Sequence, residues 1–127
     1  MALAVVDASV FIAFRTRDDP HHNAAVAALT RHRGDDIVIP ASAYAEALVE
    51  PTRMGGAVLQ RAKQLVEDFP MTIAPIDRQI AERAAELRAE VRLPDALVLA
   101  TGDVLRADVV LTADDRWQKV SRRVQVI

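Results

Sequence analysis

The chain contains no cysteine, which excludes disulfide bonds and thiolate metal ligands. Any metal ion must therefore be held by oxygen or imidazole ligands. Lysine occurs only at Lys63 and Lys119, and acidic residues slightly outnumber basic ones, for a net charge of −2. The chain thus lacks the excess of positive charge typical of a nucleic-acid-binding domain. Metal ions bound to a carboxylate site would offset part of that negative charge.

Long apolar segments are also missing. No stretch approaches the roughly 20 consecutive apolar residues of a membrane-spanning helix. Asp7 interrupts the apolar N-terminal segment MALAVVDASVFIAF, and no basic residue precedes it, so this segment makes a poor signal peptide. We therefore expect a cytoplasmic protein without membrane contact. With 51% hydrophobic and 27% charged residues over 127 positions, the composition predicts a single globular domain, residues 1–127.

Short apolar segments alternate with longer segments of helical period, which is the pattern of βα units that form a parallel sheet. Five strands are predicted, at 3–6, 37–39, 72–74, 109–112 and 124–126. Helices are predicted at 20–31, 57–68 and 77–92, at 40–50 with Pro51 ending the helix, and from Pro94 onward. The expected fold is therefore an α/β domain of three α/β/α layers, with a central parallel sheet flanked by helices.

Carboxylates follow two of these strands. Asp7 comes directly after the first strand, and Asp114 follows the strand at 109–112. Glu46 lies about two turns into the second predicted helix, and Asp95 lies in the first turn of the helix that begins at Pro94. Open α/β sheets bind their ligands at the carboxyl ends of the strands. We therefore expect the four carboxylates to face one crevice.

Four carboxylates in one crevice would repel one another strongly unless cations lay between them. Oxygen ligands alone favour Mg²⁺ or Mn²⁺. Two such ions support phosphodiester hydrolysis, because one can activate a water molecule and the other can stabilise the leaving oxygen. Backbone amides near Ser9 and Asp95, together with Arg15 and Arg116, are candidates for holding phosphates.

Each of the four acids also has a purely structural explanation. Asp7 could be an ordinary N-cap, and Glu46 could be an exposed helix residue. Asp95 could be a favourable charge in the first turn of its helix, and Asp114 could be a turn residue. Four such coincidences together are less plausible than one shared site.

Three further residues are interpreted as structural. Asp103 falls well around its helix from Asp95, and Asp108 begins a strand whose other end carries the candidate site. Gly102 lies inside a predicted helix, where glycine costs about 1 kcal/mol relative to alanine. Close packing of that helix against the sheet explains its presence.

Four segments together resemble the motifs of the PIN domain: VVDASVF near the start, AEALVE in the second helix, LPDALVLATG in the helix after Pro94, and VLTADDRW near the end. Their order and spacing match over essentially the whole chain, and the chain is most similar to VapC toxins of toxin-antitoxin operons. The resemblance implies an endoribonuclease that depends on Mg²⁺ or Mn²⁺ and cleaves tRNA or a ribosomal RNA loop. It also implies a homodimer, inhibited by a VapB antitoxin whose C-terminal segment enters a groove beside the helices bearing Phe11 and Tyr44.

The same resemblance implies roles for the acids. Asp7 would be the central metal ligand, and Glu46 and Asp95 would complete the first metal site directly or through water. Asp114 would belong to the second metal site. All four acidic positions of the motifs are occupied by acids.

Two hydroxyl residues match positions that brace the carboxylates or a bound water in the family. These residues are Ser9 and Thr112. Asp115 is left unassigned, because the motif places its acid two residues after the threonine, at Asp114.

Other functions were weighed against the same residues. A haloacid-dehalogenase-like phosphatase requires a second acid two residues after Asp7, where Ser9 stands. A receiver domain would carry a lysine near its last strand, and residues 124–127 contain none. A non-catalytic module that binds RNA or an antitoxin stays open, because sequence alone does not test turnover.

Overall fold

The structure is a computed structural model and describes residues 2–127. The elements follow in the order β1 (Leu3–Val6), α1 (Ala8–Arg15), α2 (His22–Arg31), β2 (Asp36–Pro40), α3 (Ala41–Met54), α4 (Gly56–Asp68), β3 (Thr72–Ala74), α5 (Arg78–Leu87), α6 (Leu93–Val104), β4 (Val109–Thr112), the 3₁₀ helix η1 (Asp115–Lys119) and β5 (Val124–Val126). All five predicted strands are present, and the second is longer by one residue at each end. No helix within residues 2–127 has the length and apolar character needed to cross a membrane.

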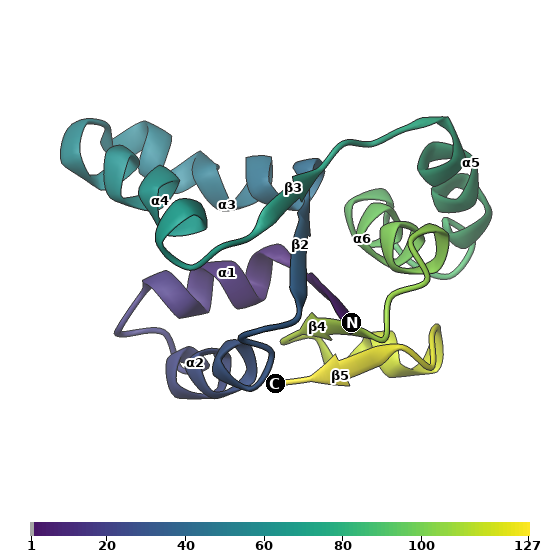
Figure 1. Cartoon of the computed structure of the whole chain (residues 1–127). Helices are drawn as coiled ribbons and strands as arrows, with labels where there is room; N and C mark the ends of the chain where they lie inside the picture. Colours follow the sequence, from purple (N-terminus) through teal and green to yellow (C-terminus); the bar gives the residue numbers. More distant parts are fainter. Residues whose placement is uncertain (1) are drawn as a thin grey trace.

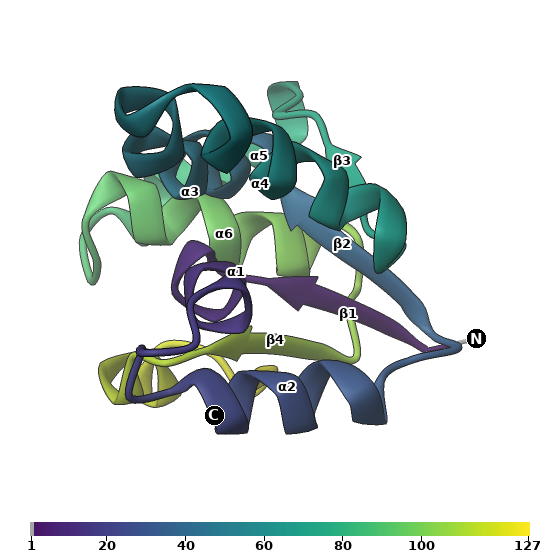
Figure 2. The same cartoon turned by 90° about the vertical axis from the view of Figure 1, so that its left-hand side faces the viewer.

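The five strands form one parallel sheet in the order β3-β2-β1-β4-β5. Helices α1 and α2 lie on one side of this sheet and α5 and α6 on the other, as Figure 1 shows and the turned view in Figure 2 also displays. The predicted α/β fold with three layers is confirmed. Because helices cover both faces, the central strands are apolar without alternation, and every residue of β4 is buried.

The strand order places a switch point beside β1. The chain moves from β1 to β2 and β3 on one side, and later to β4 and β5 on the other. Connections that leave neighbouring strands in opposite directions open a crevice at their carboxyl ends. Val6 of β1 pairs with Leu111 of β4, so the residues that follow, from Asp7 and from Thr112, meet at that crevice.

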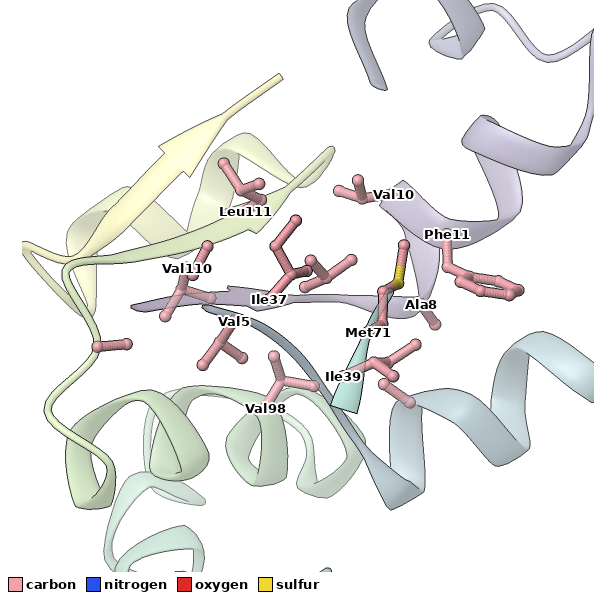
Figure 3. Packing of buried hydrophobic residues seen from close by; sticks show 14 of the residues in the cluster. Val5, Ala8, Val10, Phe11, Ile37, Ile39, Met71, Val98, Val110 and Leu111 are labelled. Carbon is pink, nitrogen blue, oxygen red and sulfur yellow. The ribbon is translucent and has the colours of Figure 1, made fainter. Parts of the chain in front are cut away.

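The core fills the space between the sheet and its helices. In Figure 3, Val5 of β1 faces Val98 of α6, whereas Leu111 and Val10 lie on the opposite side of the sheet. Gly102 of α6 explains how closely this helix approaches, since a Cβ atom at that position would lie 2.6 Å from Cγ2 of Val110. The packing role expected of Gly102 is confirmed.

The helix predicted at 40–50 ends later than expected, and the helix predicted at 20–31 begins at His22. Helix α3 continues through Pro51 to Met54 and ends at Gly55, where φ is +70°. Proline removes one helical hydrogen bond and disfavours helical backbone in the residue before it. Pro51 is buried, and α3 packs along α4, so tertiary contacts offset that cost.

The segment predicted as one helix over 77–92 is also shorter. Helix α5 ends at Leu87, and a turn separates it from α6. Its Asp77 caps the N-terminus by accepting a hydrogen bond from the backbone of Ile80 at 2.9 Å. Ile80, Ala84 and Leu87 form the buried side of this helix.

Asp103 and Asp108 have the structural roles predicted for them. Asp103 accepts from Nε of Arg83 at 2.9 Å and lies 3.4 Å from Nε of Arg123, which ties α5, α6 and the start of β5 together. Asp108 accepts from the backbone amide of Leu3 at 2.7 Å. Both carboxylates are therefore engaged away from the candidate site.

Candidate active site

Asp7 is the most buried carboxylate of the candidate site, with 7% of the residue exposed. It occupies the single position between β1 and α1, at the switch point of the sheet. Its side chain does not cap α1. Instead Oδ2 accepts hydrogen bonds from Ser9 Oγ at 2.6 Å and from Thr112 Oγ1 at 3.0 Å. The simple N-cap explanation of Asp7 therefore does not describe what its side chain does.

The two hydroxyl groups connect Asp7 to the far end of the chain. Ser9 Oγ also accepts from the backbone amide of Ala113 at 3.1 Å, and Thr112 Oγ1 accepts from the backbone amide of Asp114 at 3.1 Å. Each hydroxyl thus donates to Asp7 and accepts from the segment after β4. This network holds the carboxylate in one orientation and joins the two strand ends.

The protonation of Asp7 reflects its position. Burial raises the pKa of this carboxyl above its ordinary value, and the hydrogen bonds from Ser9 and Thr112 offset only part of that rise. Within residues 2–127, no basic side chain forms a salt bridge with it. Asp7 is therefore a buried acid with oriented lone pairs and without a cationic partner.

Glu46 and Asp95 lie near Asp7 on two other helices. Glu46 is exposed on α3, and Asp95 is half-buried in the first turn of α6. Burial raises the pKa of each, and the charge of Asp7 raises both further. Arg92, just before α6, acts in the opposite direction on both. The three carboxylates are close enough to repel one another, although even the nearest two in the sequence, Asp7 and Glu46, are 39 positions apart.

Asp114 is engaged differently. Its carboxylate accepts two hydrogen bonds from the side chain of Arg116, one from Nε at 2.9 Å and one from Nη2 at 2.7 Å. It also caps η1 by accepting from the backbone amide of Arg116 at 3.0 Å. Arg116 lowers the pKa of Asp114, whereas the charge of Asp114 raises that of Asp95. Asp114 therefore borders the acidic group but faces an arginine.

The predicted crevice is thus open rather than a closed cage. Among residues 2–127, no three acidic or histidine side chains converge tightly enough to hold a metal ion. Glu46 extends from an exposed position, and Asp114 is turned toward Arg116. The acidic side chains near Asp7 nevertheless offer only oxygen ligands, which suit hard ions such as Mg²⁺ or Mn²⁺.

A cavity of about 520 Å³ adjoins the acids. Glu90, Asp95 and Asp114 line it together with four basic side chains, and Trp117 is buried beneath it. The basic residues are Arg88, Arg92, Arg116 and Lys119. Sequence reasoning named only Arg116 among them. The position of Arg92 just before the LPD segment was the one signal available for the others.

Two further features of the site differ from or add to the sequence analysis. Arg15, expected to hold phosphate, lies with Phe14 and Leu65 in a separate cavity of about 480 Å³ between α1 and α4. That prediction was wrong, because the last turn of α1 has left the strand ends. Trp117 is 2% exposed, and its buried indole nitrogen has no hydrogen-bond partner within residues 2–127.

The molecule is thus a small α/β domain with an open parallel sheet and with Asp7, Glu46 and Asp95 near one another at its switch point. The model of the PIN domain family matches residues 4–123, which is nearly the whole chain, and the chain belongs to this family. The recognition drawn from the four sequence motifs is confirmed. No curated protein matches the chain in sequence.

Solved structures share the fold at low sequence identity. The sarcin-ricin-loop-cleaving toxin VapC20 of Mycobacterium tuberculosis is 16% identical, with a TM-score of 0.77, covering 93% of this chain and 95% of that one. A toxin-antitoxin complex from Klebsiella pneumoniae is 23% identical, with a TM-score of 0.77 and coverage of 97% and 96%. VapBC2 from Rickettsia felis, bound to a promoter DNA fragment, is 12% identical, with a TM-score of 0.77 and coverage of 98% of each chain.

Proposed function

We propose that this chain is a metal-dependent endoribonuclease and the toxin of a VapBC-type toxin-antitoxin pair. The observation that carries the proposal is Asp7, which is buried at the switch point, is oriented by two hydroxyls and forms no salt bridge with a basic side chain of residues 2–127. A buried carboxylate without a counter-ion is costly, and a bound cation would remove that cost. The similarity to VapC20, described as a sarcin-ricin-loop-cleaving toxin, supports RNA as the substrate.

The carboxylates fit a hard divalent cation. Asp7, Glu46 and Asp95 would hold the first ion. The charge of Asp7 raises the pKa of both Glu46 and Asp95, so the three lie near one another, and each offers only oxygen ligands. Asp114 would serve a second ion after exchanging Arg116 for the metal. When bound, Mg²⁺ or Mn²⁺ supplies the Lewis-acid chemistry that phosphodiester hydrolysis requires.

The residues around the carboxylates have distinct tasks. Ser9 and Thr112 fix the orientation of Asp7 through hydrogen bonds to one of its oxygens, so little reorganisation is needed when substrate arrives. Burial and the charge of Asp7 raise the pKa of both Glu46 and Asp95, and Arg92 lies close enough to offset part of that rise. The same positive charge would attract the scissile phosphate toward the acids.

Substrate and partner follow from the same assignment. The substrate would be tRNA or a loop of ribosomal RNA, and cleavage would occur in the cytoplasm. A VapB-type antitoxin would inhibit the enzyme, and the chain would form a homodimer. The antitoxin segment would bind the cavity between α1 and α4, where Phe14 and Leu65 lie among charged residues such as Arg61. Phe11 is fully buried with its ring edge-on to Tyr44, so it would not contact the antitoxin directly.

A non-catalytic RNA-binding module is the second candidate. Two observations favour it: Asp114 is paired with Arg116, and the acids do not converge on one point. A nuclease with a preformed metal site would hold its acids closer together. The two candidates differ in turnover, which makes cleavage the deciding measurement.

The test is incubation of total RNA and purified tRNA with the antitoxin-free protein in Mg²⁺ or Mn²⁺, compared with EDTA. Discrete products that require the metal and disappear in Asp7→Asn are expected. Glu50→Gln is the matched control, because Glu50 is exposed on α3 one turn beyond Glu46 and pairs only with Arg53. Absence of cleavage by a protein that still binds RNA would instead establish the non-catalytic module.

A further inference from the structure

Four basic side chains line the cavity beside Asp95 and Asp114, and a metal site made of the acids does not account for them. The two walls of this cavity come from distant parts of the chain, the α5–α6 connection and η1. Arg88 and Arg92 lie on the first wall, with Glu90 between them in the sequence, and Arg116 and Lys119 lie on the second. The chain as a whole carries a net charge of −2, so this concentration of basic side chains is local.

Most of these basic groups are free to bind a ligand. Within residues 2–127, neither Arg88, Arg92 nor Lys119 forms a salt bridge, and all three are exposed. Arg88 makes a single long hydrogen bond, from Nη1 to the carbonyl of Val91 at 3.4 Å. Arg116 alone is committed, to Asp114. Exposed, unpaired cations around a concave surface attract an extended anion more than a single small one.

We propose that this cavity is the RNA-backbone subsite of the enzyme, in which Arg88 and Lys119 bind phosphates of nucleotides that flank the scissile one. The inference rests on the proposed nuclease function. The cavity is continuous with the acids, since Asp95 and Asp114 form part of its lining. An RNA strand whose scissile phosphate lies at Asp7 and Asp95 would therefore pass its adjacent backbone between the two basic walls.

The chemistry of the lining indicates contacts with backbone rather than with bases. Contacts of arginine and lysine with phosphate oxygens position a strand without reading its sequence. The one aromatic residue of the lining, Trp117, is 2% exposed and so offers no platform for stacking a base. The subsite would therefore set affinity and the register of the strand, and sequence preference would come from elsewhere.

The test measures binding of a fluorescein-labelled single-stranded RNA of about a dozen nucleotides by anisotropy, in Mg²⁺ buffer and at several salt concentrations. All proteins carry Asp7→Asn, so the result does not depend on cleavage. Arg88→Gln/Lys119→Gln is expected to weaken binding roughly tenfold at low salt and to reduce the slope of log K against log salt by about 1.4.

The matched control is Arg31→Gln/Lys63→Gln, which removes the same two residue types and the same charge from exposed positions on α2 and α4. It is expected to leave the affinity and salt slope nearly unchanged. Equal weakening by both double variants, or no weakening by Arg88→Gln/Lys119→Gln, would overturn the subsite. Cleavage of the same RNA by the unsubstituted chain is measured separately. RNA binding that depends on the cavity, without any cleavage, would sink the nuclease assignment and retain the subsite.

Discussion

Thr112 donates a hydrogen bond to Asp7 at 3.0 Å across a separation of 105 positions in the chain. Both residues stand at the carboxyl ends of adjacent parallel strands, β4 and β1. The same hydroxyl accepts from the backbone amide of Asp114 at 3.1 Å. One buried side chain thus orients the central acid and positions the loop that carries another.

Thr112→Val keeps the shape of the side chain and removes its hydroxyl. We expect the free energy of unfolding to fall by about 1–3 kcal/mol, because Asp7 and the amide of Asp114 each lose a buried partner. RNA cleavage should fall by roughly tenfold or more, as for other residues that orient a metal ligand. Urea unfolding and initial cleavage rates provide the two measurements.

Thr101→Val is the control for that substitution. Thr101 is equally buried, but its hydroxyl donates only to the carbonyl of Leu97 within α6, at 2.7 Å. A comparable loss of cleavage in Thr101→Val would show that the Thr112 effect is general disruption of the core.

Asp7→Asn should stabilise the metal-free protein while abolishing cleavage. Burial raises the pKa of Asp7, so its ionised form is less stable in the folded state than in the unfolded one. We expect Asp7→Asn to have the higher unfolding midpoint near pH 7.5 in EDTA, measured by thermal unfolding.

The sign of this effect predicts its pH dependence. The folded-state pKa of Asp7 lies above the ordinary unfolded value, so the destabilisation grows as pH rises from the unfolded pKa through the folded one. Below both values Asp7 is protonated in both states, and the advantage of Asp7→Asn should disappear near pH 3. An advantage that stays constant from acidic to neutral pH would mean that ionisation of Asp7 does not cause it.

Mn²⁺ should raise the unfolding midpoint of the unsubstituted chain in a concentration-dependent manner. Asp7 raises the pKa of Glu46 and Asp95 through charge repulsion, and a bound cation would relieve it. At about 100 times the dissociation constant, the stabilisation would be roughly 2.7 kcal/mol. Differential scanning fluorimetry with a Mn²⁺ titration measures it.

Glu46→Gln and Glu50→Gln separate a site effect from nonspecific charge. Both lie on α3, but only Glu46 is coupled to Asp7 and Asp95. We expect Glu46→Gln to shift the Mn²⁺ titration to higher concentration by several-fold and Glu50→Gln to leave it in place. Identical shifts in the two variants would contradict the proposed ligand set.

Gly102→Ala should destabilise the fold without entering the active site. The added Cβ would lie 2.6 Å from Cγ2 of Val110, so α6 or β4 must shift, at a cost of about 1–3 kcal/mol. The double variant Gly102→Ala/Val110→Ala removes the clashing methyl groups. We therefore expect the two substitutions to cost less together than the sum of their separate effects, measured by urea unfolding. Strict additivity would rule out the clash.

Local sequence patterns predicted much of this molecule because they depend on neighbours a few residues away. The strand positions followed from short apolar segments without polar alternation, as expected for strands that helices cover on both faces. The packing role of Gly102 followed from the free-energy cost of a glycine inside a helix. The PIN motifs also placed Asp7 and Asp114 at strand ends in the right order. The continuation of α3 through Pro51 was missed, because burial of that proline offsets a local penalty.

The sequence by itself determined which acids are available and on which elements they lie, since periodicity and turn residues define those elements. Tertiary structure alone decided that Asp114 faces Arg116 and that Arg15 lines another cavity. It also decided that Arg88 and Lys119 line one cavity together with Asp95. The physical reason is distance. These pairings depend on how helices and strands far apart in the chain pack together, and on which charges meet there once the core has closed.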